Sequence, residues 1–312
     1  MDNLPQILPD TSASIATAAR ALIAGELVAL PTETVYGLAG RADRDEAVAA
    51  IYRAKGRPDF NPLIVHVADP AAAERLAAFD DRARALAARF WPGPLTLVLP
   101  LREGAGLAAA VTAGLPTVAL RCPAHPVMRA VLAASGLPLA APSANRSGAV
   151  SPTCAAHVAD SLAGRIGLAI DGGACAAGLE STIVALRADG GWQVLRPGPI
   201  GREELVAVLG SEPGATGTGI EAPGQLASHY APGKPVRLDA TEAREGEFLI
   251  GFGPVAGDCN LSETADLAEA AARLYACLHR AAAAPQGRIA VAPVPREGIG
   301  IAINDRLGRA AA

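Results

Sequence analysis

Short apolar segments alternate along this chain with longer segments of helical periodicity. That alternation predicts an α/β fold in which helices cover a sheet. Because strands and helices do not alternate regularly, we expect a twisted, mixed, open sheet rather than a doubly wound parallel one. Aromatic residues make up only 4% of the 312 residues, against 51% for all hydrophobic residues, so the core must be built from Ala, Val, Leu and Ile.

The apolar pattern gives the positions of the predicted elements. In the first part of the chain, strands are expected at Leu27–Leu30, Leu63–Val67, Leu95–Leu99, Thr117–Leu120, Leu137–Ala141, Gly167–Ile170, Thr182–Leu186 and Trp192–Leu195. Helices are expected at Ile15–Leu22, Ala71–Phe90, Pro126–Ala134, Pro152–Ala163 and Arg202–Leu209, and another helix ends near Ala54. Asp43 with Glu46 is typical of a capping box for that helix, and Ser151 of an N-cap before Pro152.

The segment from Gly210 to Lys234 has no periodicity and predicts a linker or mobile loop. Beyond it, strands are expected at Val236–Leu238, Phe248–Ile250 and Ile289–Ala292, with helices at Thr264–Ala284 and Gly300–Ala310. We therefore expect three parts: a large α/β domain at 1–209, a linker or lid at 210–235, and a small Rossmann-like α/β domain at 236–312.

Charge, cysteine content and hydropathy argue against several classes of protein. The net charge of −4 argues against a nonspecific coat for nucleic acid. Five scattered cysteines without a CxxC pair predict neither structural zinc nor a disulfide framework. No apolar run is long enough to span a bilayer, and the N-terminus lacks a basic region followed by an apolar stretch. We expect a cytoplasmic protein with no membrane partner and no protein-bound metal.

Polar side chains gather at the ends of the predicted strands, where α/β sheets usually bind ligands. They are Thr32, Glu33, Thr34, Tyr36, Lys55, Arg57, Asn61, His66, Arg121, Ser143, Asn145, Arg146, Ser147, Glu180, Ser181, Thr182 and Arg196. Positive charges together with hydroxyl and amide donors suit a polyphosphate, whose oxygens need fixed donors. No GxxxxGK[ST], HExxH or GxSxG motif is present, which leaves little support for the sites that those motifs build.

Lys55 stands out because the chain has only one other lysine and uses arginine everywhere else. Its retention indicates a need for a compact ammonium rather than a planar guanidinium. Taken singly, other residues also have structural interpretations. His66 could be a core histidine and Arg196 a surface arginine, while Ser143 and Asn145 could make turn hydrogen bonds.

A set of segments resembles the threonylcarbamoyl-AMP synthase family in its two-domain form, which has a YrdC-like catalytic domain. These segments are PTETVYGLAG (31–40), KGRPDFNPLIVHV (55–67), WPGPLTLVL (91–99), RCPAHP (121–126), APSANRSG (141–148), GLESTIV (178–184) and LRPGPI (195–200). SHYAPGKPV (228–236) is similar to the family's linker, and GIGIAINDRLGRAA (298–311) to the end of its small domain. The resemblance implies condensation of L-threonine, bicarbonate and ATP to threonylcarbamoyl-adenylate with release of pyrophosphate. A separate tRNA threonylcarbamoyl transferase complex is expected to use that product.

The resemblance also implies roles for single residues. The catalytic group around the nucleotide phosphates comprises Lys55, Arg57, Ser143 and Asn145. The implied contacts of ATP are Arg57, Asn61, Thr117, Ala141, Ser143, Ser151, Arg196 and Tyr230. The implied threonine pocket comprises Thr34, His66, Arg121 and Ser181. Mg²⁺ is expected on the ATP phosphates without a protein cage.

The predicted linker is expected to act as a lid. His229 and Tyr230 could fold over the catalytic cleft and exclude water from it. Lys234 is a candidate hinge or phosphate contact in the same segment. We also expect Lys55→Ala to lower turnover far more than it perturbs folding.

Two rival interpretations stay open. A non-catalytic YrdC-like module could bind RNA weakly in a basic groove, and a carbamoyl transferase could act through carbamoyl-adenylate. The acidic net charge weighs against the first, and the lack of zinc-finger-like cysteine clusters weighs against the second.

Overall fold

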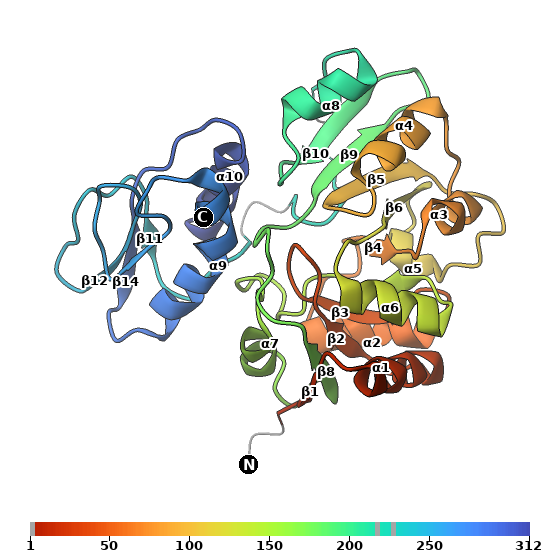
Figure 1. Ribbon diagram of the computed structural model, residues 1–312, viewed down its shortest axis with the longest axis horizontal. Helices are drawn as coiled ribbons and strands as arrows, with labels where there is room; N and C mark the ends of the chain where they lie inside the picture. Colours follow the sequence, from red (N-terminus) through yellow and green to blue (C-terminus); the bar gives the residue numbers. More distant parts are fainter. Residues whose placement is uncertain (1–3, 216–218, 226–228) are drawn as a thin grey trace.

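Ten strands of the described chain form one large sheet, and four form a second, smaller sheet (Figure 1). The structure is a computed structural model that describes residues 4–215, 219–225 and 229–312. Residues 216–218 and 226–228 of the predicted linker, which include the first residue of the SHYAPGKPV segment, lie outside the described residues.

The large sheet has the strand order β1-β8-β2-β3-β7-β4-β6-β5-β9-β10. Its strands are β1 (Gln6–Pro9), β2 (Val28–Leu30), β3 (Gly37–Arg41), β4 (Ile64–His66), β5 (Leu95–Pro100), β6 (Thr117–Arg121), β7 (Leu139–Ala140), β8 (Leu168–Asp171), β9 (Thr182–Leu186) and β10 (Trp192–Arg196). Some neighbours are parallel, such as β4 with β6, and others are antiparallel, such as β5 with β6. The predicted mixed, open sheet is confirmed.

Helices accompany this sheet, with α1 beside α6 and α4 beside α8 (Figure 1). They are α1 (Ser12–Ala24), α2 (Asp45–Lys55), α3 (Pro70–Leu76), α4 (Asp81–Phe90), α5 (Ala109–Thr112), α6 (Pro126–Ser135), α7 (Ala155–Ser161) and α8 (Arg202–Leu209). Within the described ranges, no helix combines the length and the apolar character needed to cross a membrane.

The single helix predicted at Ala71–Phe90 is wrong. The chain forms α3 and α4 there, because Ala77 takes an extended conformation at the end of α3. Asp80 then starts a new helix by accepting a hydrogen bond from the backbone N–H of Ala83 at 2.8 Å. A local cap thus interrupts a helical pattern that continues in the sequence.

Both predicted N-caps are also wrong. The Asp43 carboxylate caps no helix and instead forms an ion pair with Arg41 Nε at 2.6 Å. Ser151 caps none either, because α7 begins only at Ala155. The Ser151 hydroxyl donates to the Glu180 carboxylate at 2.6 Å instead.

The sequence pattern does not predict β1, β3, β13 or α5. In β3, glycine occupies two of the five positions, and glycine disfavours strands. Antiparallel pairing with β2 on one side and β7 on the other supplies the strand. Tertiary pairing therefore overrides local propensity at this point.

The second sheet, in the order β11-β14-β12-β13, is parallel throughout. Its strands are β11 (Val236–Arg237), β12 (Glu247–Gly251), β13 (Cys259–Asn260) and β14 (Arg288–Val291). Helices α9 (Leu267–Ala283) and α10 (Gly300–Ala310) lie on the side of this sheet that faces the larger domain (Figure 1). This is the small α/β domain that the sequence predicts.

One hydrophobic cluster belongs to both domains. It contains Leu274 of α9 and Ile289 of β14, together with Val35, Val150 and Leu179 from the larger domain. Burial of these side chains stabilises the contact between the domains, since each apolar side chain removed from water contributes favourably.

Gly178 brings the backbones of the two domains into contact. A Cβ atom at this position would lie 2.4 Å from the Cα atom of Ala272 in α9, and the φ angle of Gly178 is +66°. Glycine is therefore required both for space and for the left-handed conformation.

We expect Gly178→Ala to lower the free energy of unfolding by about 2–5 kcal/mol, because it combines left-handed strain with overpacking against α9. Urea denaturation followed by circular dichroism measures this loss. Gly136→Ala is the matched control, since Gly136 has the same φ of +66° but open space around an added Cβ. The control should lose about 1–2 kcal/mol, and equal losses in the two variants would contradict the tight contact with α9.

Candidate active site

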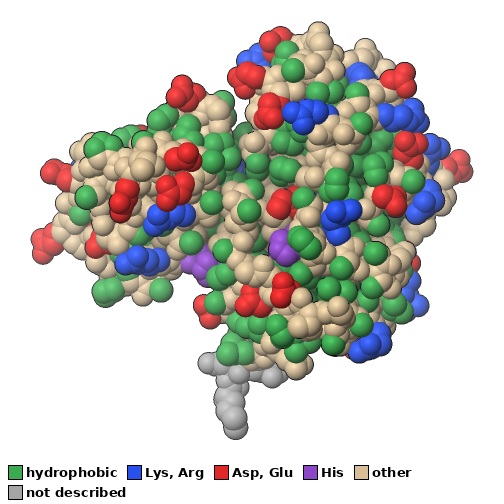
Figure 2. Space-filling model, in the orientation of Figure 1, with side chains coloured by type: hydrophobic (Ala, Val, Ile, Leu, Met, Phe, Trp, Pro, Cys, Tyr) green, Lys and Arg blue, Asp and Glu red, His purple; other side chains and the backbone are tan. Residues whose placement is uncertain are grey.

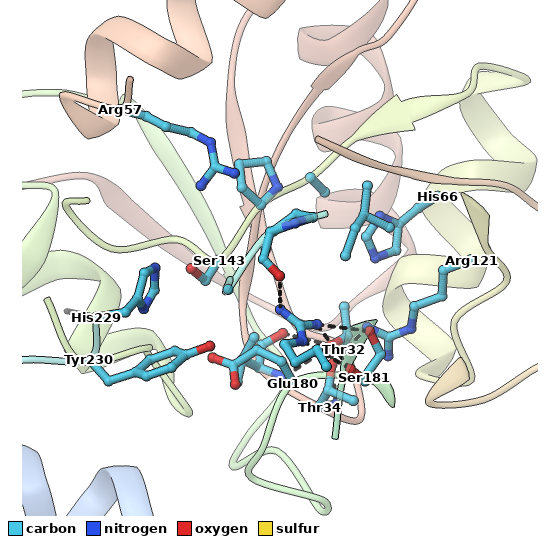
Figure 3. Close-up of a pocket in the computed structure, with 18 residues that line it drawn as sticks. Thr32, Thr34, Arg57, His66, Arg121, Ser143, Glu180, Ser181, His229 and Tyr230 are labelled. Atoms are coloured by element: carbon cyan, nitrogen blue, oxygen red, sulfur yellow. Dashed lines mark hydrogen bonds between the residues drawn. The ribbon is translucent and has the colours of Figure 1, made fainter. Parts of the chain in front are cut away.

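A small, partly open cavity lies where β4 and β6 end, between the loop after β2 and the linker (Figure 3). It offers about 40 Å³ to the centres of water-sized molecules, which is room for only a few waters. Its lining residues are Thr32, Thr34, Val35, Gly37, Arg57, Ile64, His66, Arg121, Ala141, Pro142, Ser143, Glu180, Ser181, Arg196, Pro223, Gly224, His229 and Tyr230. The structure thus brings together polar residues from strand ends that lie far apart in the sequence.

Two buried arginines, Arg57 and Arg196, contribute positive charge to the cavity. Arg57 donates to the carbonyl oxygens of Asn61 at 3.2 Å and Pro62 at 2.9 Å. Arg196 donates to the carbonyl oxygen of Ser181 at 3.0 Å. Burial lowers the pKa of Arg57 to about 10, so its guanidinium stays protonated at neutral pH. Because carbonyl oxygens carry no net charge, these bonds neutralise neither arginine, although the charge of Arg196 also acts on the nearby Glu180 carboxylate.

The predicted phosphate ligand Lys55 lies behind the cavity wall rather than in it. Its ammonium donates to the carbonyl oxygens of Ser143 at 2.6 Å and Asn145 at 2.5 Å. Burial, aided by the charge of Arg57, lowers the pKa of Lys55 well below its usual value. Lys55 therefore fixes the loop that presents Ser143 to the cavity, and one N–H of the ammonium remains.

Arg121, Thr34 and His66 lie together at another part of the cavity (Figure 3). Arg121 donates to Thr34 Oγ1 at 2.8 Å and to Glu33 Oε1 at 2.6 Å. Burial opposes ionisation of Glu33, but the charge and hydrogen bond of Arg121 outweigh it and lower the pKa of Glu33. Arg121 has more N–H donors than its bonds use, so it can also bind a carboxylate of a ligand.

His66 belongs to the cavity rather than to the hydrophobic core. It ends β4 directly beside Arg121 in β6, with which it is in register. Its Nδ1 atom is buried and has no hydrogen-bond partner among the described residues. Burial, with the charge of Arg121 adding to it, lowers the pKa of His66 to about 3. The imidazole is therefore neutral and keeps a polar atom for a ligand.

The described part of the linker borders the cavity. His229 and Tyr230 line it, and their rings meet edge to face at 4.1 Å. Tyr230 is fully buried and has a φ of +64°, which is strained for a residue with a side chain. Its hydroxyl has no partner in the part of the chain that the structure describes. The structure thus places His229 and Tyr230 at the cavity, as the sequence predicts.

Other residues predicted to contact ATP differ in their distance from the cavity. Ala141 lines it. Asn61 supports Arg57 through its carbonyl oxygen, and its buried Oδ1 lacks a partner among the described residues. Thr117 begins β6 while Arg121 ends it, so the structure does not bring Thr117 to the cavity.

Asn145 and Ser151 support the cavity from behind its wall. The side-chain nitrogen of Asn145 donates to the carbonyl oxygens of Arg146 and Ala149, both at 2.8 Å. The Asn145 Oδ1 atom is buried without a partner in the described chain. Ser151 reaches the cavity only through its hydrogen bond to Glu180.

Glu180 is the one carboxylate among the described residues that line the cavity, and sequence analysis assigns it no role. Its oxygens accept from Ser151 and from Arg306 Nε at 2.9 Å. Burial opposes ionisation of Glu180, but the charges of Arg306 and Arg196 outweigh it and lower its pKa to about 2. Arg306 lies 126 residues further along the chain, so no local pattern could reveal the pair.

Lys234 makes no contact with the cavity. Its ammonium donates to the carbonyl oxygens of Ala281 at 2.9 Å and Ala284 at 2.6 Å, at the C-terminus of α9. Positive charge is favourable at this end of a helix. Lys234 is therefore a helix cap rather than a phosphate contact.

Comparisons with known proteins agree along nearly the whole chain. The Sua5/YciO/YrdC family model, described as "Telomere recombination", matches residues 20–198, and the model "Threonylcarbamoyl-AMP synthase, C-terminal domain" matches residues 200–312. A threonylcarbamoyl-AMP synthase of Bacillus subtilis is 42% identical over 95% of this chain and 92% of its own length. One of Pyrococcus abyssi is 40% identical over 92% of this chain and 90% of its own. The crystal structure of Pyrococcus abyssi Sua5 complexed with L-threonine superimposes with a TM-score of 0.89 at 37% identity, covering 98% of this chain and 97% of that one.

The two lysines provide a matched pair of variants. Lys55→Met and Lys234→Met should each lower the free energy of unfolding by about 2–4 kcal/mol, since each removes a charged donor from two carbonyl groups. Only Lys55→Met should also abolish most of the activity, because only Lys55 holds the loop of Ser143. Urea unfolding and turnover are measured for both. Equal activity in the two variants would contradict the role of Lys55, and unchanged stability of Lys55→Met would contradict the two bonds.

His66 should make stability depend on pH. The unfolded chain protonates His66 near pH 6.5 and the folded protein only near pH 3, so the unfolded state binds one more proton between these values. Stability therefore falls as the pH falls through this range, by about 1.4 kcal/mol per pH unit from this residue. His66→Asn should remove that slope when urea unfolding is repeated between pH 7 and pH 4. Parallel pH profiles of the two proteins would be inconsistent with a buried, neutral His66.

Proposed function

This chain belongs to the threonylcarbamoyl-AMP synthase family, and we infer that it condenses L-threonine, bicarbonate and ATP to threonylcarbamoyl-AMP and pyrophosphate. The observation that carries this inference is the content of the cavity. It combines buried arginines bonded to neutral carbonyls with a separate cluster of arginine, hydroxyl and imidazole groups.

The cluster around Arg121 suits the amino acid. Its guanidinium can bind the threonine carboxylate, because spare N–H donors and a fixed geometry favour a bidentate contact. Thr34 and Ser181 supply hydroxyls, and neutral His66 supplies an unpartnered ring nitrogen. We assign threonine to this part of the cavity.

The wall of Arg57, Ser143 and Arg196 suits the phosphates of ATP. Two buried cations next to a hydroxyl can neutralise the charge that develops on the leaving pyrophosphate. Mg²⁺ is proposed to enter with ATP, held by phosphate oxygens and water. Among the described lining residues Glu180 is the one carboxylate, and the described ranges contain no group of three His, Cys, Asp or Glu side chains that could hold a metal ion. A single carboxylate suits a metal that the nucleotide brings with it.

The proposed chemistry has two bond-forming steps. The threonine amine attacks the carbon of bicarbonate, and a carbamate forms with loss of water. A carbamate oxygen then attacks the α-phosphorus of ATP while the bond to the β-phosphate breaks and pyrophosphate leaves. Because a carbamate decomposes in water, we propose that His229 and Tyr230, which line the cavity, close over it and protect the carbamate until it reacts.

The cavity argues against a module that only binds RNA. Arg57, Arg121 and Arg196 are at most 9% exposed, so they cannot form a groove for a nucleic-acid backbone. Acidic and basic side chains are interspersed on the face shown in Figure 2. We propose that the RNA link is indirect: the product is passed to a transferase complex that modifies tRNA, and both steps take place in the cytoplasm.

The reaction is tested with purified protein, ATP, bicarbonate and L-threonine. Pyrophosphate and an adenylate that contains both threonine and the bicarbonate carbon should form together. Omission of either threonine or bicarbonate should abolish both products. If pyrophosphate release continues unchanged without threonine, the proposed function is wrong.

A further inference from the structure

Three consecutive residues connect the small domain with the cavity. Leu179 packs into the hydrophobic cluster that both domains share. Ser181 lines the cavity, and its hydroxyl shares a hydrogen bond with Thr96 Oγ1 at 2.7 Å. Glu180 lies between them. Because a planar peptide bond joins the two residues, the contacts of Glu180 restrict the position of Ser181, together with the bonds that Ser181 makes to Thr96 and Arg196.

The small domain holds Glu180 with two side chains. Tyr275 of α9 donates its hydroxyl to Glu180 Oε2 at 2.8 Å, and Arg306 of α10 donates Nε to the same oxygen at 2.9 Å. Arg306 also donates Nη2 to the carbonyl oxygen of Pro197 at 2.9 Å. The planar guanidinium thus ties two separate segments of the larger domain to one another in a fixed geometry.

Stability alone does not account for this arrangement. Arg306 is fully buried and Glu180 nearly so. Taking both charges out of water offsets most of their attraction, and a buried ion pair is often no more stabilising than apolar side chains of similar size. What the pair provides is a defined position for the segment that carries Ser181.

Arg306 and Tyr275 also pack against Tyr230 of the linker. The Arg306 guanidinium lies 5.4 Å from the ring centre of Tyr230, and the rings of Tyr230 and Tyr275 are 5.5 Å apart. Tyr230 has a left-handed backbone, which persists only where packing holds it. Figure 3 shows Tyr230 and Glu180 beside one another at the cavity.

We propose that Glu180, Arg306 and Tyr275 are positioning residues, through which the small domain orders both the threonine end of the cavity and Tyr230 of the linker. This inference rests on the proposed function of the cavity. In this proposal Glu180 acts through its position: Ser151 donates to one of its oxygens, and Tyr275 and Arg306 donate to the other.

The test compares Arg306→Lys with Arg237→Lys. Arg237 forms an ion pair with Glu247 at 2.6 Å inside the small domain and is not among the residues that line the cavity, so it is the matched control. Arg306→Lys keeps the positive charge but loses the planar guanidinium that donates to both Glu180 and Pro197. It should raise the KM for threonine and lower kcat/KM about ten- to hundredfold, the effect of losing a hydrogen bond to a charged group. Arg237→Lys should leave both constants within about twofold.

A purely structural role predicts a different pattern. Loss of folded protein lowers the apparent kcat and leaves the KM for threonine unchanged. If Arg306→Lys has the KM of the wild-type protein, as Arg237→Lys is expected to have, the inference is overturned.

Tyr275→Phe is the second variant, in case Arg306→Lys does not fold. It removes only the hydroxyl bound to Glu180 and keeps the ring beneath Tyr230, so the KM for threonine should rise about tenfold. An unchanged KM would count against the inference.

Titration calorimetry with L-threonine measures binding separately from the reaction. This test holds even if pyrophosphate release by the wild-type protein proves independent of threonine. A larger dissociation constant for threonine in Arg306→Lys, but not in Arg237→Lys, would support the positioning role. Equal dissociation constants in the two variants would overturn it.

Discussion

Pairing of buried cations with backbone carbonyls is the interaction on which the cavity depends. Lys55, Arg57 and Arg196 each donate to carbonyl oxygens at distances of 2.5 to 3.2 Å. These bonds satisfy the donors geometrically, and the positive charges of Arg57 and Arg196 make the cavity favourable for a polyanion. The fold must therefore hold the carbonyl-bearing loops firmly, because each loop that moved would leave a buried cation without partners.

The small domain contributes to that firmness by supporting the cavity wall from behind, through Glu180. A shared hydrophobic cluster, the backbone contact at Gly178 and the Glu180–Arg306 pair all cross the boundary near the same segment. Apolar burial supplies the attraction between the domains, whereas the buried hydrogen bonds select one arrangement of them. Apolar burial thus determines how strongly the domains associate, and the hydrogen bonds determine in which arrangement they do so.

The sequence predicts structural features that depend on neighbouring residues. It does not predict features that depend on residues distant in the chain. The mixed sheet and the helices α1, α6 and α8 follow from local patterns. The residues that gather at the cavity follow from strand ends and from family resemblance. The capping roles of Asp43 and Ser151 fail because Arg41 and Glu180 compete for their oxygens. The part played by Glu180 was not predictable, since its partners come from α9 and α10.

The size of the cavity sets a limit on how the molecule can work. A space that admits only a few waters is too small for a nucleotide, so the proposed synthesis requires the cavity wall, to which Tyr230 belongs, to move. Movements of this kind typically take microseconds to milliseconds. The rate of the proposed synthesis then has an upper limit set by that movement as well as by the chemistry.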